Sequence, residues 1–531
     1  MSYRKLNLDR DKINLCRTTA SRIINPLQKY IDRHSTTCIE SSIIKLLFNS
    51  TDEASDIVIQ KLGKDRLRKG AALWLGNALI HTRLRPDELV AKIAEGEITI
   101  DNIPKLPIDK IKTKLISIAS AEIQRIKKEF ENPHENSQQY NVKPLIIIQK
   151  EKISSREALK QAGKEPADII LFDNYDILKN NLSDIKVSCN KKFGYKIDGA
   201  RAPQRTATSL KSGVDLIAID LIKQTLSNHI NIKKILIDSN WIGKIISKTN
   251  TKIYSDAVHV RNLDAYREAH QIVALQLMLE RLFMNSNIIP EQFIVTHAYD
   301  IDPSLNDGFI NELARASLMR ELYPKNLTVY LSPAARKLNT PDHYSRIFTL
   351  FQLSGIITEQ SAILIPQKED NADILKSIQQ ISDNTTSLGD EIQFNPNGKI
   401  TRRAHIIVEN TLKLLKKIEQ SGFYKALSDG LIAGIKTNEK HGSGLNDIFQ
   451  KDRDYFNPFA DLADSKEENY CVSSRDLSIR TKSKDPEQKK DQKTASSAPR
   501  SEGQGTLRTK KRRRYKKYSA QKKNIQDKEQ I

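Results

Sequence analysis

Residues 144–172 read PLIIIQKEKISSREALKQAGKEPADIILF, and this stretch decides the expected fold class. Two short runs rich in isoleucine and leucine, at 145–148 and 168–172, have the length and composition of buried strands. The polar segment between them is typical of a helix. The stretch therefore predicts a strand, a helix and a second strand in succession.

The same alternation continues towards the C-terminus. Further apolar runs of strand length occur at 235–237, 252–254, 293–296, 329–331 and 362–365. Residues 214–219 are either a further strand or a helix. About eight strands with helices between them favour a closed β/α barrel whose active site lies at the C-terminal ends of the strands. An open, doubly wound sheet is the alternative, although no GxGxxG motif follows any of these strands.

Helical periodicity flanks the predicted barrel on both sides. The N-terminal region carries several amphipathic helical patterns, and helix returns around 399–427. Beyond residue 459 the chain is polar and poor in large apolar side chains, so this tail is expected to be disordered. The predicted division is a helical region at 1–131, a barrel at 144–370, a second helical region at 371–459 and a disordered basic tail at 460–531.

The charge balance is strongly basic. The chain has 531 residues with 86 Lys and Arg against 65 Asp and Glu, a formal net charge of +21. Much of the excess lies in one run at 508–518, so the net charge describes the tail more than the folded body. This run either contacts a polyanion such as RNA, DNA or acidic lipid, with Tyr515 and Tyr518 available for base stacking, or is solvated without a partner.

Cysteine usage and hydropathy indicate the compartment. The four cysteines lie far apart with no CxxC pair, which argues against a disulfide framework and against a zinc site. The first residues carry charges throughout, and no segment has the roughly 20 consecutive apolar residues of a membrane span. We expect a cytoplasmic protein without a membrane span.

Several blocks of the sequence are similar to the α subunit of D-lysine 5,6-aminomutase, and less closely to ornithine aminomutase. The blocks are IDRHSTTCIES at 31–41, KGAALWLGNALIHTRLRPDELVAKIAEGEITIDNIPKLP at 69–107, LDAYREAHQIV at 263–273, THAYDIDPSLNDGFINELARASLMRELYP at 296–324, DEIQF at 390–394 and GSGLNDIFQKDRDYFNPF at 442–459. Because so many blocks occur in the same order, the chain is identified as a divergent member of this family.

The resemblance implies a TIM-like barrel, here shorter in its central part, that holds adenosylcobalamin and pyridoxal phosphate against each other. In the family a separate β subunit supplies the cobalamin-binding Rossmann domain and the lysine that binds pyridoxal phosphate. This chain agrees with that division because it has no DxHxxG motif for a cobalamin-ligating histidine; Asp32 and His34 lack the glycine. The implied activity is that of an isomerase, an intramolecular 1,2-amino shift by a radical mechanism, and it requires the β subunit as partner.

The resemblance also implies cofactor contacts. Glu359, in GIITEQ, falls on a family glutamate that contacts the adenosyl group, and Asp256, in IYSDAV, lies near an acidic adenosyl-contact loop. His297 and Tyr299 end an expected strand, where a barrel places its chemistry. The alternatives are a solvated loop carboxylate for Glu359 and a satisfied, buried imidazole for His297.

Two segments depart from the family's contacts to the phosphate of pyridoxal phosphate. The family uses an RTTGQS loop after its second barrel strand, whereas this chain has FDNYDILK, with Asp173 and Asn174 near the arginine position. A second family arginine aligns with Asp238, which follows the expected strand 235–237. Negative charge at these positions would repel a phosphate rather than neutralise it.

A substitute anion site has one candidate segment, FGYKIDGARAPQR at 193–205. Its glycines allow close backbone approach, and the guanidinium groups of Arg201 and Arg205 match phosphate geometry. The alternative is a flexible basic loop.

The sequence is thus compatible with three functions: an active aminomutase subunit with a rearranged phosphate site, a non-catalytic paralogue that binds a partner as a scaffold, and a nucleic-acid-associated protein that binds through its basic tail. The two charge reversals favour the second function over the first.

Overall fold

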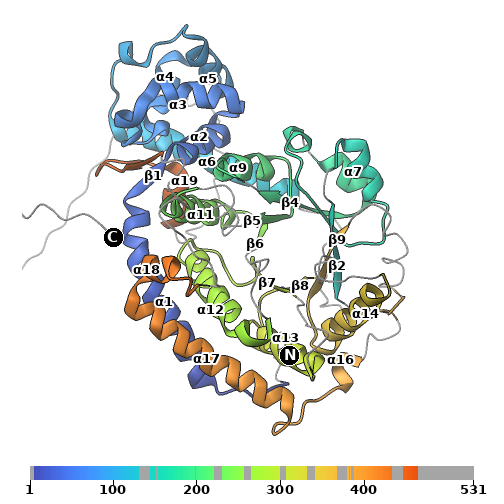
Figure 1. Cartoon of the computed structure of the whole chain (residues 1–531). Coiled ribbons are helices and arrows are strands. Elements are labelled where there is room, and N and C mark those ends of the chain that lie inside the picture. The colour runs from blue at the N-terminus through green and yellow to red at the C-terminus, as the bar shows by residue number, and fades with distance from the viewer. Residues whose placement is uncertain are drawn as a thin grey trace, which may run out of the picture. The chain divides into compact units, whose positions relative to one another are not determined.

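The alternating strands and helices at the centre of the sequence form a closed barrel of parallel strands (Figure 1). The computed structural model describes residues 5–130, 144–150, 153–180, 182–197, 199–219, 230–255, 265–298, 306–331, 341–367, 380–381, 383, 388–432 and 447–464. The barrel strands, in spatial and chain order, are β2 (Leu145–Lys150), β3 (Ile169–Phe172), β4 (Lys192–Ile197), β5 (Leu216–Ile219), β6 (Lys252–Ser255), β7 (Phe293–Ala298), β8 (Thr328–Leu331) and β9 (Ala362–Gln367). The predicted TIM-like barrel is confirmed, and the open sheet is not formed.

One predicted strand was wrong, and one strand was missed. Residues 235–237 lie inside the helix α11 (Ile232–Ile246), which is buried on nearly all sides, so its run of aliphatic residues resembles a strand. Lys192–Ile197, interpreted from the sequence as part of a basic loop, forms the strand β4. The uncertain stretch 214–219 contains the strand β5.

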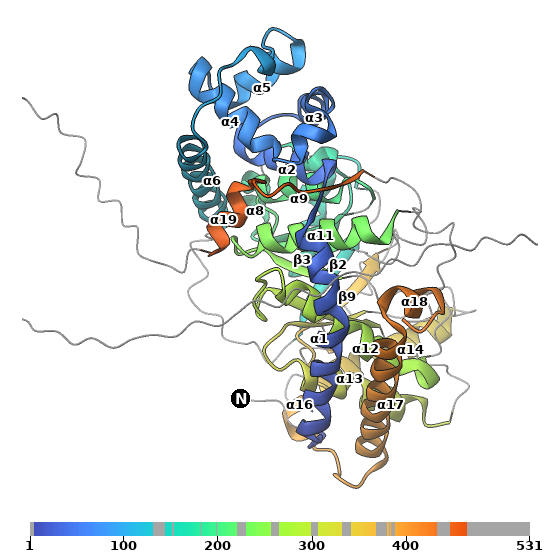
Figure 2. The same cartoon turned by 90° about the vertical axis from the view of Figure 1, so that its left-hand side faces the viewer.

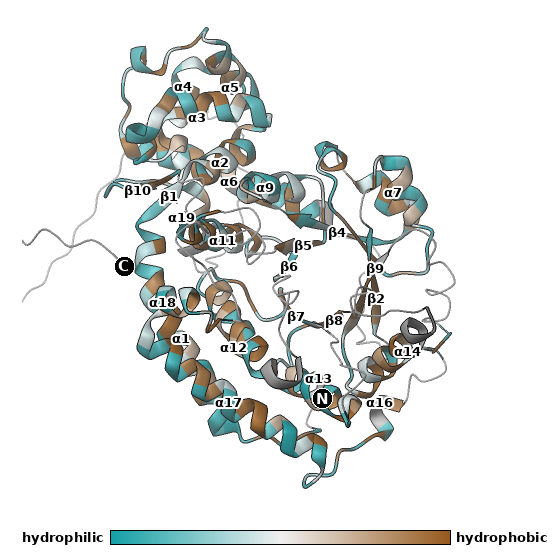
Figure 3. Cartoon of the chain, in the orientation of Figure 1, coloured by the Kyte–Doolittle hydropathy of each residue, from teal (hydrophilic) through white to brown (hydrophobic). Residues whose placement is uncertain are grey.

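Two separate sets of buried apolar side chains show which way the strand residues point. One set consists of strand residues alone and fills the barrel interior: Ile147, Ile169, Leu171, Leu216, Ala218, Tyr254, Ile294, Val329, Leu331, Ala362 and Leu364. The alternate strand residues, such as Phe193 and Tyr195, belong to a larger core that they share with the helices. Figure 3 shows the apolar colouring along β2 and β9. The interior is therefore a packed core and not a channel.

Helices between the strands cover the outside of the barrel. They are α7 (Arg156–Ala162), the 3₁₀ turn η2 (Asp176–Lys179), α8 (Ser183–Cys189), α9 (Ala202–Lys211), α11, α12 (Ala265–Met284), α13 (Gly308–Leu322) and α14 (Pro341–Ile357). Among the described residues, no helix is long and apolar enough to cross a membrane.

The N-terminal region is helical, as expected. Its elements are α1 (Arg10–Asp32), α2 (Thr37–Phe48), α3 (Asp52–Leu67), α4 (Ala71–Thr82), α5 (Pro86–Glu95), the 3₁₀ turn η1 (Ile100–Asn102) and α6 (Ile108–Phe130). Thr36 and Thr51 cap α2 and α3, because each hydroxyl accepts a backbone N–H from the first turn of its helix.

The last described residues return to the N-terminal region. The strand β10 (Ile448–Gln450) pairs antiparallel with β1 (His34–Thr36). The helices of this part of the chain are α16 (Leu388–Glu391), α17 (Lys399–Ser421), α18 (Phe423–Ser428) and α19 (Pro458–Asp464). The helices α1 and α17 lie side by side, as Figures 1 and 2 show from two directions. The chain divides into the units Met1–Glu468 and Asn469–Ile531, and the basic run 508–518 lies outside the described residues.

Candidate active site

The inner face of the barrel becomes polar at the C-terminal ends of the strands. Register pairs Lys196 of β4 with Ala218 of β5, which belongs to the interior set, so Lys196 points inward. Gln149 of β2 points inward by the same argument, because it pairs with Leu171. Among the strand residues that the structure describes, Lys196 is the one charged side chain on the inner face near this end. This mouth is where a β/α barrel carries its chemistry.

Lys196 was missed by the sequence reasoning. The signal was present in the alternation of KFGYKI, in which Phe193, Tyr195 and Ile197 occupy one face and Lys196 the other. The segment was interpreted as a loop because of its glycine and its basic residues. Gly194 instead serves packing, since a Cβ at this position would lie 2.8 Å from Leu171 Cδ1.

The loop after β3 does not fit a phosphate group. Asn174 Nδ2 donates to the backbone oxygen of Ile153 at 2.8 Å, and Asn174 Oδ1 accepts the backbone N–H of Asp176 at 2.9 Å. The side chain of Asn174 is thus used by its own loop, and Asp173 beside it is exposed and acidic. Neither residue offers the cationic or hydroxyl donors that a phosphate needs.

The two arginines of the predicted substitute site contact the outer elements instead. Arg201 Nη2 lies 3.0 Å from Asp56 Oδ2 of α3. The Arg205 guanidinium lies 5.7 Å from the centre of the Tyr175 ring, whose hydroxyl in turn donates to Asp52 of α3. These contacts join α9 to the helical region. They do not bring the arginines to the barrel interior.

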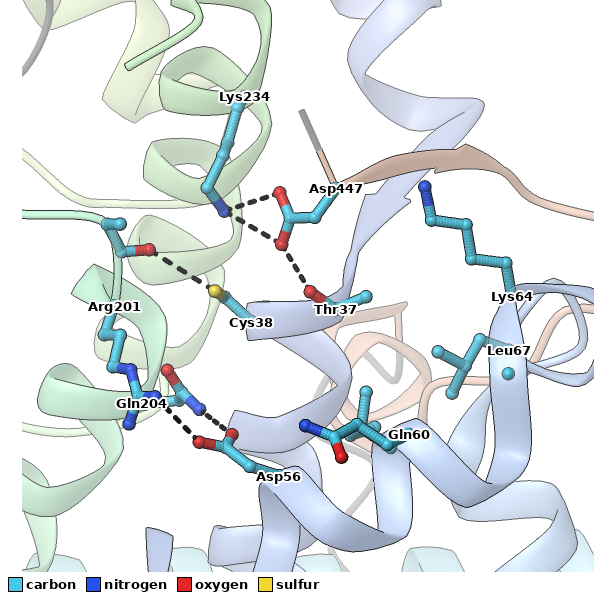
Figure 4. Close-up of a pocket in the computed structure, with 13 residues that line it drawn as sticks. Thr37, Cys38, Asp56, Gln60, Lys64, Leu67, Arg201, Gln204, Lys234 and Asp447 are labelled. Atoms are coloured by element: carbon cyan, nitrogen blue, oxygen red, sulfur yellow. Dashed lines mark hydrogen bonds and ion pairs between the residues drawn. The ribbon is translucent and has the colours of Figure 1, made fainter. Parts of the chain in front are cut away.

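A cavity of about 540 Å³ lies beside the loop between β4 and α9, against α2, α3 and α11 (Figure 4). Polar side chains such as Gln204 and Lys64 line it, and Cys38 Sγ donates to the backbone oxygen of Ala200 at 3.3 Å. Burial raises the pKa of Cys38 to about 12, so the group is a thiol and not a nucleophilic thiolate. The residues that line this cavity come from helices and a loop outside the barrel. Cys38, the cysteine in its lining, is a protonated thiol and so does not act as a nucleophile there.

The second predicted charge reversal, at Asp238, does not concern the mouth. Asp238 lies on the buried helix α11, where Asp238 Oδ2 is 2.8 Å from Lys234 Nζ and Asp238 Oδ1 accepts the Thr36 hydroxyl at 2.6 Å. Asp447 completes the cluster at 3.0 Å from Lys234 Nζ (Figure 4). Burial disfavours the charged amine, but the two carboxylates raise the pKa of Lys234 above its ordinary value. Asp238 is thus an ion-pair partner inside a buried helix, and its expected place directly after a barrel strand was wrong.

His297 lies between the barrel and its helices. It pairs in register with Tyr330, which belongs to the outer core, and the centres of the two rings lie 4.9 Å apart with their planes tilted by 35°. Gln360 donates through Nε2 to the backbone oxygen of Ala316, so its Oε1 accepts the Nε2–H of His297 at 2.9 Å. The side chain is fully buried. His297 was expected either to line the active site or to be a buried imidazole. The structure shows a buried imidazole that is hydrogen-bonded to Gln360.

The neutral state of His297 predicts an acid sensitivity. Burial, with the nearby charge of Arg315, lowers the pKa of His297 to about 3 from 6.5. The unfolded chain binds a proton at this residue below pH 6.5 whereas the folded chain does not, so acid stabilises the unfolded state. We expect the free energy of unfolding to fall between pH 6.5 and about 3, by up to about 1.4 kcal/mol per pH unit for this one proton. Urea unfolding of His297→Gln should show a shallower slope, and identical slopes in the two proteins would contradict the assignment.

Glu359 lies at the opposite end of the barrel from the mouth. It stands between α14 and β9, where the strand begins. Glu359 Oε1 is 2.8 Å from Lys5 Nζ, and Lys5 also donates to the backbone oxygen of Ile357 at 2.8 Å. The structure therefore does not bring Glu359 together with Lys196. Its contact with an adenosyl group stays a prediction.

Two predicted site residues remain. Asp256 and Tyr299 lie outside the described residues, each just beyond the end of a barrel strand. Within the described part of the chain, no three His, Cys, Asp or Glu side chains gather into a group that could hold a metal ion.

Comparisons with known proteins show the family to which the chain belongs. A family model described as the D-lysine 5,6-aminomutase TIM-barrel domain of the alpha subunit matches residues 6–171 and 173–462. The lysine 5,6-aminomutase alpha subunits of Acetoanaerobium sticklandii and Fusobacterium nucleatum subsp. nucleatum are each 26% identical to this chain, over 512 and 517 residues, and cover 86% of this chain and 98% of the relative. Among solved structures, the dihydropteroate synthase of Yersinia pestis has a TM-score of 0.32 and 11% identity, over 46% of this chain and 93% of that chain. The family match covers most of the chain, which therefore belongs to the D-lysine 5,6-aminomutase alpha-subunit family.

Proposed function

We propose that this chain is the barrel subunit of an adenosylcobalamin- and pyridoxal-phosphate-dependent aminomutase acting on D-lysine, and that it works with a separate cobalamin-carrying subunit. The observation that carries the proposal is the match to alpha subunits over 98% of their length, with the whole closed barrel included. The family resemblance alone suggests the cofactors and the substrate.

The described residues would contribute enclosure and binding. The apolar interior beneath the mouth excludes water, which protects a radical reaction from the solvent. Lys196 and Gln149 supply polar groups at the mouth. When bound, the two cofactors supply the radical chemistry, and the partner brings the cobalamin because this chain lacks a DxHxxG motif.

The non-catalytic alternative rests on the loop after β3, where Asp173 and Asn174 depart from a phosphate site. Asp238 lies in a buried ion-pair cluster and does not help to choose between the two functions. We also place the protein in the reducing cytoplasm, since the described cysteines Cys16, Cys38 and Cys189 are free thiols.

The proposal is tested by reconstitution with a partner. The full chain should co-elute in size-exclusion chromatography with the cobalamin-binding β subunit of a lysine 5,6-aminomutase. The complex, loaded with both cofactors, should convert D-lysine into its 2,5-diamino isomer, as measured by chromatography of the products, whereas each subunit alone should not. A stable complex that neither binds pyridoxal phosphate nor turns over D-lysine would contradict the proposal and favour the scaffold. Failure to form any complex would contradict both.

A further inference from the structure

The strand register gives the height of Lys196 along the barrel axis. Register runs from Gln149 to Leu171 and from Leu171 to Gly194. The strands of such a barrel are tilted relative to the barrel axis. Side chains at the same height along the axis are therefore shifted towards the C-terminal end by about one residue for each strand crossed, compared with the hydrogen-bond register. Lys196, two residues beyond Gly194, therefore lies level with Gln149. The two side chains form part of the uppermost described layer, and both are partly buried.

An apolar floor lies directly below this layer. It contains Leu171 and Ala218, and the missing side chain of Gly194 lets Leu171 fill the space beneath Lys196. Lys196 is partly buried above this floor, and partial burial strengthens the attraction between an ammonium group and an anion relative to water. The helix α9 begins a few residues after β4 at the same end of the barrel, and its N-terminus adds positive potential.

We propose that Lys196 is the cationic contact for an oxyanion at the barrel mouth, and that the oxyanion is the phosphate of a phosphorylated ligand. In this chain the contact would come from inside strand β4, whereas the loop after β3, with Asp173 and Asn174, does not supply it. The inference rests on the proposed function for the identity of the ligand, pyridoxal phosphate. The role of Lys196 is to bind the phosphate by its charge, and no covalent step is assigned to it.

The strand itself offers a matched control. Lys192 is the register partner of Ile169 and so shares the inner face of β4, but it lies at the N-terminal end of the strand. Lys192→Gln and Lys196→Gln thus remove the same charge from the same face at opposite ends of the barrel. Lys196→Arg keeps the charge and removes the primary amine.

The test measures binding to the full chain by isothermal titration. Lys196→Gln should bind pyridoxal phosphate at least about tenfold more weakly than the wild type, as expected for loss of one charge-assisted contact. Lys192→Gln and Lys196→Arg should stay within about threefold of the wild type, and pyridoxal, which lacks the phosphate, should bind all four proteins alike. The inference is overturned if Lys196→Gln binds as the wild type does, if both glutamine variants weaken equally, or if Lys196→Arg fails as completely as Lys196→Gln. It is also overturned if the loss in Lys196→Gln appears for D-lysine and not for pyridoxal phosphate, since the anion is then a carboxylate.

A second measurement separates this inference from the proposed function and does not depend on variants. Inorganic phosphate should protect Lys196, but not Lys192, from an amine-labelling reagent, as read by mass spectrometry of the wild-type chain. If the chain binds neither pyridoxal phosphate nor pyridoxal, the proposed function fails, while protection of Lys196 by phosphate still supports the anion site. Equal labelling with and without phosphate overturns it.

Discussion

Lys234→Met is expected to lower the free energy of unfolding by about 3–5 kcal/mol, the range for breaking a buried ion pair on one side. The Lys234 side chain is 1% exposed and lies between Asp238 and Asp447. Its removal leaves the carboxylate of Asp238 in the core, where the Thr36 hydroxyl is its remaining hydrogen-bond donor among the described residues. Urea unfolding of the full chain, followed by circular dichroism, measures the loss.

Two further variants identify the cause of the loss. Lys234→Met combined with Asp238→Asn should recover part of the stability, because no isolated carboxylate then remains on α11. Lys12→Met removes the same side chain from an exposed pair with Glu409, at 2.8 Å, and should leave the unfolding curve nearly unchanged. Equal effects of Lys234→Met and Lys12→Met would show that the buried cluster does not stabilise the fold.

Short apolar runs were sufficient to predict the barrel but not to assign each run to a strand. Ile235, Leu236 and Ile237 are all buried, and a helix buried on all sides has the same composition as a buried strand. The strand β4 was missed for the opposite reason. Lys192 and Lys196 point into the two ends of the barrel, so the strand has charged residues at positions where a buried strand is expected to be apolar.

The roles of the predicted site residues were less predictable than the fold, because their contacts join residues far apart in the sequence. Nothing near Asp238 in the chain indicates that the Thr36 hydroxyl will donate to Asp238, or that Asp447 will pair with Lys234. The family alignment could therefore treat Asp238 as a lost phosphate contact. Glu359 is a second example. In a parallel barrel, a residue just before a strand and a residue just after one lie at opposite ends. Glu359 precedes the strand β9, so it lies at the end opposite the mouth.

Gly70→Ala is expected to be the most disruptive small substitution in the helical region. Gly70 has a φ of +93°, where an L-residue is strained by about 1–3 kcal/mol. In addition, a Cβ at this position would lie 2.4 Å from the backbone oxygen of Phe456. A backbone atom cannot move aside by changing rotamer, so overpacking should add about 1–3 kcal/mol. Thermal unfolding of the variant measures the sum.

The matched control for this substitution is Gly63→Ala. Gly63 also has a positive φ, +68°, but no atom lies within 4 Å of the position of its Cβ, so the variant carries the backbone strain without the collision. The Phe456 backbone N–H donates to the Lys69 oxygen at 3.1 Å, next to Gly70, so this is one of the points where the C-terminal segment is held. Hydrogen exchange should therefore rise across residues 447–464 in Gly70→Ala and not in Gly63→Ala. If the two variants lose the same stability and leave that segment equally protected, strain alone accounts for the effect, and close approach of the two backbones is not what requires glycine at position 70.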